Sequence, residues 1–222
     1  MVNVCGIDEA GRGPCIGSMF IVGTLYEEGK LKALRDIGVK DSKLLPHKKR
    51  VELAKKIRKI ANKVKVIQIE PREIDDAVDG KDGLNLNWLE AIKTAEIINE
   101  LEPDKAVIDC PSPNIRAYTN FLKKYIKKSL LDKVILIIEH KADKNYVECA
   151  SSSIIAKVSR EQEVEKIENM VGQSIGSGYT SNPVCQKFLK ESWDKYPGLF
   201  RRTWISWKNH KHMKDQKKIE EF

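Results

Sequence analysis

Apolar and polar residues recur along the chain with two periods, one typical of strands and one of helices. Short runs rich in Val, Ile and Leu, bounded by turn-forming residues, predict five strands, over residues 2–8, 16–25, 64–69, 105–110 and 134–138. Apolar residues at steps of three or four predict helices over residues 30–37, 46–61, 84–101, 114–128, 145–171 and 182–195. Strands that alternate with helices after an antiparallel-looking pair indicate an α/β sheet covered by helices.

The composition changes after Gly172, where several glycines mark a loop before the last helix. We therefore predict one domain over residues 1–172 and a small helical extension with a basic tail over residues 173–222. The stretch from Arg201 to Lys218 carries seven basic residues, one acid and two tryptophans. Such a mixture suits a nucleic-acid backbone and stacked bases, or an amphipathic helix whose tryptophans pack on the core.

The charge of the chain favours a polyanionic partner. Its 222 residues contain 40 Lys and Arg against 32 Asp and Glu, which gives a formal net charge of +8 at pH 7. This excess promotes association with nucleic acid but is also compatible with an ordinary basic soluble protein, and it does not define the fold.

The cysteines and the apolar runs exclude several classes of protein. The five cysteines are scattered and form no Cys-x-x-Cys motif, so neither a zinc site nor a disulfide framework is predicted. We expect small buried thiols in a reducing compartment. The apolar runs are too short to span a bilayer and no leader is visible, so we expect a cytoplasmic protein without a membrane partner.

The most informative motif lies at the end of the first predicted strand. The adjacent acids Asp8 and Glu9 are followed by Gly11, Arg12 and Gly13. Carboxylates are suitable ligands for Mg²⁺ or Mn²⁺, and a glycine-flanked arginine lets backbone N–H groups and a guanidinium approach a phosphate or sugar. The motif indicates a site that cuts phosphodiesters, although a solvated loop would also carry such residues.

Acids follow three of the predicted strands. They are Asp8, Glu9, Asp109 and Asp143. Parallel neighbouring strands bring their carboxyl ends to one edge of the sheet, where four carboxylates would repel one another unless cations neutralised them. Two Mg²⁺ or Mn²⁺ ions about 4 Å apart would do so. In the last of these segments Asp132 and Glu139 are alternatives to Asp143.

Consecutive strand residues point to opposite faces of a sheet. Asp8 and Glu9 can therefore reach one metal site only if the strand ends or twists at this point. We expect the following glycines to allow this.

Five motifs occur together in the order found in one family. They are residues 6–14 (GIDEAGRGP), 41–43 (DSK), 108–109 (ID), 140–143 (HKAD) with 150–157 (ASSSIIAK), and 176–179 (GSGY) with 182–183 (NP). Over nearly its whole length the chain resembles type 2 ribonuclease H, that is, ribonuclease HII. The resemblance implies a five-stranded mixed sheet of the RNase H type flanked by helices, with a small helical C-terminal extension.

The resemblance also implies an activity. It is metal-dependent endonucleolytic cutting of RNA in RNA–DNA hybrids and at single ribonucleotides embedded in duplex DNA, with 3′-hydroxyl and 5′-phosphate ends. Asp8, Glu9, Asp109 and Asp143 would be the catalytic acids that bind Mg²⁺ or Mn²⁺. A monomer is the expected state.

Residues that contact the substrate follow from the same resemblance. Gly11, Arg12 and Gly13 would hold the ribose 2′-hydroxyl and the adjoining phosphate. Tyr179 would pack on the sugar of the following deoxynucleotide. Lys43 would contact a phosphate, or it is a solvated lysine in a turn.

The last seven residues resemble the clamp-binding peptide of replication and repair proteins. Gln216, Ile219 and Phe222 have the spacing that places an aliphatic and an aromatic group in one pocket of a sliding clamp. The usual second aromatic residue is missing, and a frayed charged terminus is the alternative.

Two other functions are compatible with parts of this pattern. One is another nuclease with the RNase H fold that acts on DNA. The other is a basic nucleic-acid-binding protein without catalytic activity.

Overall fold

The structure is a computed structural model, and it describes residues 1–39 and 45–210. The chain forms two compact units that alternate along the sequence. The first contains Met1–Ala10, Phe20–Gln68 and Leu86–Ser159, and the second contains Gly11–Met19, Ile69–Asn85 and the chain from Arg160 onwards. The chain thus passes from one unit to the other directly after the acidic pair. The division predicted between residues 172 and 173 stays a prediction.

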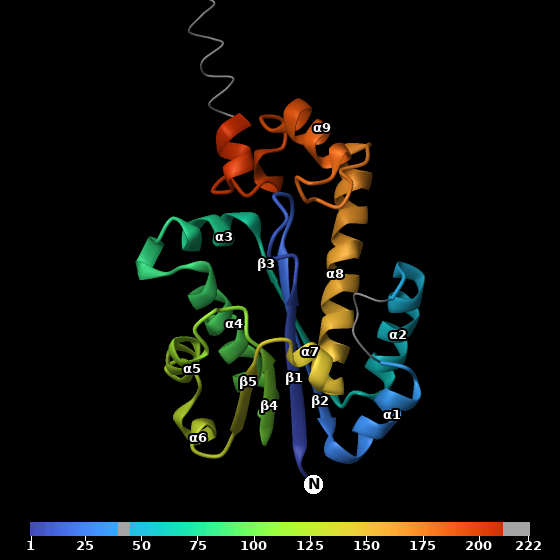
Figure 1. Ribbon diagram of the computed structural model, residues 1–222, viewed down its shortest axis with the longest axis vertical. Coiled ribbons are helices and arrows are strands. Elements are labelled where there is room, and N and C mark those ends of the chain that lie inside the picture. Colours follow the sequence, from blue (N-terminus) through green and yellow to red (C-terminus); the bar gives the residue numbers. More distant parts are fainter. Residues whose placement is uncertain (40–44, 211–222) are drawn as a thin grey trace, which may run out of the picture. The chain divides into compact units, whose positions relative to one another are not determined.

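The first unit is built on a five-stranded sheet with the strand order β3-β2-β1-β4-β5 (Figure 1). The strands are β1 (Asn3–Ala10), β2 (Met19–Glu27), β3 (Lys63–Ile69), β4 (Lys105–Asp109) and β5 (Ile135–Glu139). β1 pairs antiparallel with β2 and parallel with β4, which pairs parallel with β5. The predicted mixed sheet is confirmed.

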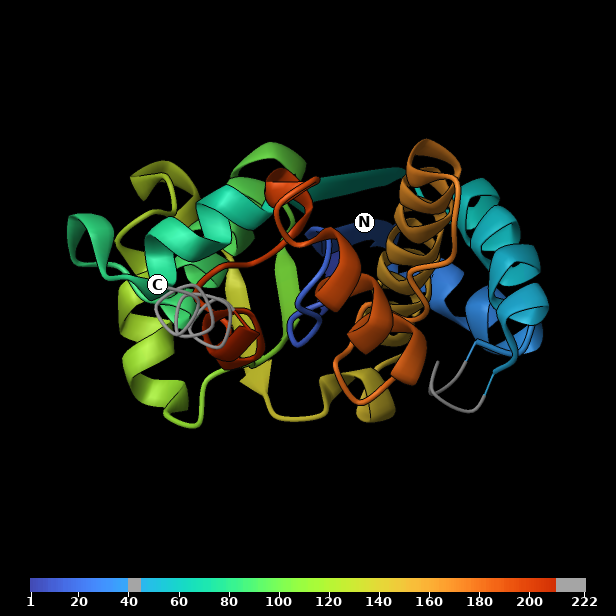
Figure 2. The ribbon, with the colours of Figure 1, turned by 90° about the horizontal axis from the view of Figure 1, so that it is seen from above.

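Helices cover both faces of this sheet (Figure 2). One face packs against α1 (Leu31–Asp36), α2 (His47–Ile60) and the first part of α8 (Val147–Val171) in a shared apolar core. On the other face α4 (Leu86–Leu101) lies so close to β2 that Gly23 has no space for a side chain beside Ile97. The stacked rings of Trp88 and Phe121, 4.4 Å apart, join α4 to α5 (Ile115–Lys123).

Small residues at the start of α8 allow this helix to lie directly on β1. Ser152 Oγ donates a 2.7 Å hydrogen bond to the carbonyl of Gly6, and Cys149 Sγ donates to the carbonyl of Ile7 at 3.2 Å. Ser151 Oγ bonds to the hydroxyl of Tyr26 on β2 at 2.8 Å. Buried hydroxyls are stable only when they are hydrogen-bonded, so these contacts fix the helix against the strand.

The segment between β5 and α8 is short. A left-handed residue, Lys141 (φ 63°), precedes the single turn of α7 (Ala142–Asn145).

A second short helix, α6 (Lys128–Leu131), lies between α5 and β5, so the helix predicted over residues 114–128 is interrupted.

The second unit contains α3 (Pro71–Val78), α9 (Pro183–Ser192) and a helical stretch over residues 205–210. Its core includes Ile16, Phe188 and Phe200, with Trp204 and Trp207 packed on it. The two tryptophans of the basic tail pack on the core, as one of its two interpretations expects, while residues 211–222 of the tail lie outside the described residues. The sequence pattern does not predict α3: it indicates that Pro71 ends a strand, whereas in the structure Pro71 occupies the first turn of this helix.

All five cysteines are buried and form no disulfide, as expected. Within the described part of the chain, no helix combines the length and the apolar character needed to cross a bilayer.

Candidate active site

Three aspartates meet at the carboxyl edge of the sheet. Asp8 lies in β1, Asp109 ends β4 and Asp143 lies in α7, and one carboxylate oxygen of each is within 4.8 Å of the others. The register explains the first pair, because Ile7 is the parallel partner of Ile108 and the next residues are therefore neighbours. Of the four acids expected at this edge, Asp8, Asp109 and Asp143 lie together, and their role as metal ligands stays a prediction.

Asp143 is held in this group by the turn that precedes α8. The backbone N–H of Ala142 donates a 3.1 Å hydrogen bond to Asp109 Oδ1, and Asp143 itself is buried. The two alternatives are not in this group of three. Asp132 is exposed, and Glu139, although it is the strand partner of Asp109, accepts a hydrogen bond from the Tyr146 hydroxyl at 3.0 Å.

The electrostatics of the cluster favour a cation. Burial raises the pKa of Asp8 well above its ordinary value, the charges of Glu9 and Asp109 raise it further, and a hydrogen bond from Ser153 opposes the shift. The pKa of the Cys149 thiol is raised by burial and then by the charges of the three aspartates. A cluster of buried carboxylates is unfavourable unless cations compensate it, so the donor set fits Mg²⁺ or Mn²⁺.

Glu9 occupies a different position from the three aspartates. The prediction that the strand ends at Asp8 is wrong, because β1 continues to Ala10 and side chains keep alternating between its faces. Within the described residues the group of three aspartates does not include Glu9. Its backbone N–H donates to Asp8 Oδ1 at 2.7 Å, and its side chain lines a small cavity with Glu90 and Tyr118.

Glu90 is a further acid of this site that is not among the residues predicted from the sequence. It is 1% exposed, lies on α4 and lines the same cavity as Asp8, Glu9 and Asp109. A signal was present in the sequence: Glu90 begins a row of buried helix positions at steps of three or four. The row continues through Thr94, Ile97 and Leu101.

The Gly-Arg-Gly motif lies in the loop Gly11–Ser18 of the second unit, which connects β1 to β2. Gly11 has φ +85°, a conformation that side chains rarely adopt, and a methyl group there would lie 2.9 Å from the carbonyl oxygen of Ser18. The glycine is therefore required by the backbone path of the loop.

Tyr179 lies beside this loop within the same unit. A methyl group placed on Gly13 would come within 3.0 Å of Tyr179 Cε1, so the tyrosine ring needs a glycine opposite it. The N–H of Cys15 donates to the carbonyl of Gly178 at 2.9 Å, which links the two loops. Two motifs more than 160 residues apart thus come together, and the Tyr179 side chain is 44% exposed.

Several predicted residues cannot be placed. Lys43, Gln216, Ile219 and Phe222 lie outside the described residues.

Comparison with known proteins decides the family. The family model of Ribonuclease HII matches residues 5–210. The chain belongs to the ribonuclease HII family. Its enzymatic class follows from this membership: it is a hydrolase with ribonuclease H activity.

Named relatives and solved structures agree with this assignment. Ribonuclease HII of Methanothermobacter thermautotrophicus is 40% identical over 208 residues, which cover 92% of this chain and 97% of that protein. The crystal structure of ribonuclease H2 from Pyrococcus horikoshii superposes with a TM-score of 0.84 at 36% identity, covering 95% of this chain and 98% of the other. Ribonuclease HII from Archaeoglobus fulgidus, solved in complex with PCNA, gives a TM-score of 0.78 at 35% identity, over 93% and 94% of the two chains.

Proposed function

We propose that this ribonuclease HII uses divalent metal ions to cut RNA in RNA–DNA hybrids and at single ribonucleotides embedded in duplex DNA, leaving 3′-hydroxyl and 5′-phosphate ends. The observation that carries the proposal is the convergence of Asp8, Asp109 and Asp143 within 4.8 Å of one another. Family membership supports the ribonuclease activity, and the acidic cluster supports its dependence on metal.

Each acid has a role that its position supports. Asp8, Asp109 and Asp143 would hold Mg²⁺ or Mn²⁺, which when bound activates water and neutralises charge on the phosphate. Glu9 is the next residue after Asp8 in β1. It would complete the set of metal ligands from the cavity that Asp8 and Asp109 also line. The hydrogen bonds from Ser153 and from the N–H of Ala142 keep Asp8 and Asp109 in fixed orientations.

Selection of a ribonucleotide would be the task of the loop. Only the 2′-hydroxyl distinguishes RNA from DNA at a single nucleotide. Backbone groups of Gly11, Arg12 and Gly13 that bond this hydroxyl would be left unpaired against deoxyribose, which gives strong discrimination. The exposed ring of Tyr179 beside Gly13 is available to pack on the next sugar.

The direct test uses two duplexes of identical sequence, one entirely DNA and one with a single ribonucleotide. We expect cutting of the second only, and only with Mg²⁺ or Mn²⁺ present. Cutting that persists in excess EDTA would contradict the metal mechanism. Equal cutting of both duplexes would favour the alternative of an RNase H-like nuclease that acts on DNA.

A second proposal concerns the C-terminal peptide. The relative from Archaeoglobus fulgidus has been solved in complex with PCNA, a finding that supports clamp binding by this chain. The spacing of Gln216, Ile219 and Phe222 is the reason to assign this binding to the C-terminal peptide. Removal of residues 216–222 should weaken binding to the sliding clamp and leave the cutting of hybrids unchanged. A pull-down that the truncation does not change would contradict this role.

A further inference from the structure

Arg201 is completely buried although it carries a charge. Its exposed fraction is 0%, and burial, with the charge of Arg160, lowers its pKa to about 10, so it stays ionised at neutral pH. A buried charge is tolerated only when hydrogen bonds replace the lost water. The partners of Arg201 therefore show what its burial achieves.

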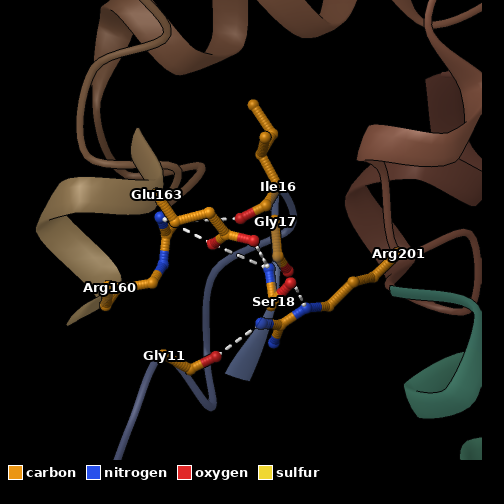
Figure 3. Close-up of polar contacts among 7 residues, drawn as sticks. All are labelled: Gly11, Ile16, Gly17, Ser18, Arg160, Glu163 and Arg201. Carbon is orange, nitrogen blue, oxygen red and sulfur yellow. Dashed lines mark hydrogen bonds and ion pairs between the residues drawn. The ribbon is translucent and has the colours of Figure 1, made fainter. Parts of the chain in front are cut away.

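All three nitrogens of the guanidinium group donate to the Gly11–Ser18 loop. Figure 3 shows the bonds to Gly11 and Gly17. Nε donates to the carbonyl of Gly17 at 2.9 Å, Nη1 to the carbonyl of Arg12 at 2.8 Å and Nη2 to the carbonyl of Gly11 at 2.5 Å. One rigid planar group thus fixes two consecutive peptide groups of the Gly-Arg-Gly motif and the far end of the loop.

Trp204 extends this arrangement to the next peptide. Its Nε1 donates to the carbonyl of Gly13 at 3.0 Å, and its ring lies 5.1 Å from the guanidinium carbon of Arg201. The consecutive carbonyls of Gly11, Arg12 and Gly13 are therefore all bonded by one short segment.

A charged pair, Arg160 and Glu163, supports the opposite side of the loop. Arg160 Nη2 donates to the carbonyl of Ile16 at 2.8 Å, and both carboxylate oxygens of Glu163 accept from the N–H of Ser18 at 2.9 Å. Arg160 Nη1 and Glu163 Oε2 are 3.5 Å apart, and both side chains are largely buried. Arg160, Glu163 and Arg201 together carry two positive charges and one negative charge. This net positive charge favours binding of the anionic phosphate backbone of a nucleic acid.

The direction of the peptide groups follows from covalent geometry. In a trans peptide the C=O and the following N–H point in opposite directions. Because the carbonyls of Gly11 and Arg12 point at Arg201, the N–H groups of Arg12 and Gly13 point away from it. Because Arg201 is fully buried, in this arrangement it would act through the loop and not by contact with the substrate.

We propose that Arg201 is the positioning residue for ribonucleotide selection: by holding the carbonyls of Gly11, Arg12 and Gly17, it orients the N–H groups that bond the ribose 2′-hydroxyl. This inference rests on the proposed function of the Gly-Arg-Gly loop. Lysine cannot replace the arginine, because one ammonium group cannot match three carbonyls in fixed directions.

The test is Arg201→Lys in the Asp109→Asn background, which keeps the substrate intact. Binding of two labelled duplexes, all-DNA and with one ribonucleotide, is measured by fluorescence anisotropy in Mg²⁺. We expect the preference for the ribonucleotide to fall about tenfold, the effect of one or two hydrogen bonds, while the affinity for DNA stays unchanged. Arg202→Lys is the matched control, since Arg202 is exposed and its replacement should leave the preference intact.

A second variant keeps the test decisive if Arg201→Lys does not fold. Trp204→Phe retains an aromatic ring but removes the donor to Gly13, and should lower the preference by about threefold. The inference would be overturned if both variants fold and keep the full preference for the ribonucleotide, or if they lose affinity for both duplexes equally. The proposed function would stand in either case. If the background protein itself shows no preference, the proposed function of the loop fails, and this inference with it.

Discussion

The backbone N–H of Ala142 donates a hydrogen bond of 3.1 Å to Asp109 Oδ1. This contact joins the first residue of α7 to the last residue of β4 and so brings Asp143, the next residue, into the group that contains Asp8 and Asp109. The orientation of one acid thus determines the position of another. The cluster should respond as a unit to changes in any of its members.

Asp109→Asn should reduce cutting by about a thousandfold or more, because the metal ligands and the bond to Ala142 are both altered. Binding of an RNA–DNA hybrid should be retained, since the loop residues are unchanged. Single-turnover cleavage and anisotropy assays measure the two effects. The matched control is Asp132→Asn, an exposed aspartate outside the cluster that should leave both unchanged. A cleavage rate within tenfold of wild type for Asp109→Asn would contradict the proposed metal site.

The stability of the metal-free protein should fall as the pH rises. The pKa of Asp8 in the folded protein lies well above its ordinary value of 3.8, so the folded state retains a proton that the unfolded state has released. The free energy of unfolding therefore decreases as the pH rises above about 4, until the folded protein also releases this proton.

Thermal unfolding in EDTA measures this effect. The decrease in Tm between about pH 5 and pH 8 should be smaller for Asp8→Asn than for wild type. Mg²⁺ should raise the Tm of wild type at pH 8 and have less effect on the variant. Equal slopes of Tm against pH for both proteins would argue against a buried, proton-retaining Asp8.

Gly11→Ala should destabilise the protein by about 1–2 kcal/mol, because a side chain at φ +85° is strained and meets the carbonyl of Ser18. Urea unfolding measures this change. Gly29→Ala is the control, since Gly29 has no positive φ and no atom within 4 Å of a methyl group there. A similar loss of stability in both variants would show that the effect is not specific to the loop.

Tyr179→Ala should lower kcat/KM for a duplex with one ribonucleotide about tenfold, because an exposed ring that packs on a sugar is lost. Tyr179→Phe should retain most of the activity, since the ring and not the hydroxyl makes this contact.

Tyr125→Ala serves as the control for Tyr179→Ala, because the two side chains are exposed to almost the same extent, 43% and 44%. Its kcat/KM should equal that of wild type. If Tyr179→Ala and Tyr125→Ala behave alike, the role proposed for Tyr179 is wrong.

The sequence alone was sufficient for the sheet and for the identity of most of the acids. Strand and helix periods reflect local burial, so β4, β5 and α8 could be predicted within a few residues. Asp8 and Asp109 could be paired because acids that follow parallel strands share one edge of a sheet. Motif order was sufficient to indicate the family.

Only the tertiary structure decided between Asp143 and its alternatives, because the choice depends on a left-handed turn at Lys141 and a hydrogen bond to Asp109. It also revealed the buried position of Arg201, a charged residue that local patterns treat as solvated. Its burial depends on partners distant in the sequence: its nitrogens reach carbonyls about 190 residues away. Contacts at such separation have no local period, and therefore no window of sequence predicts them.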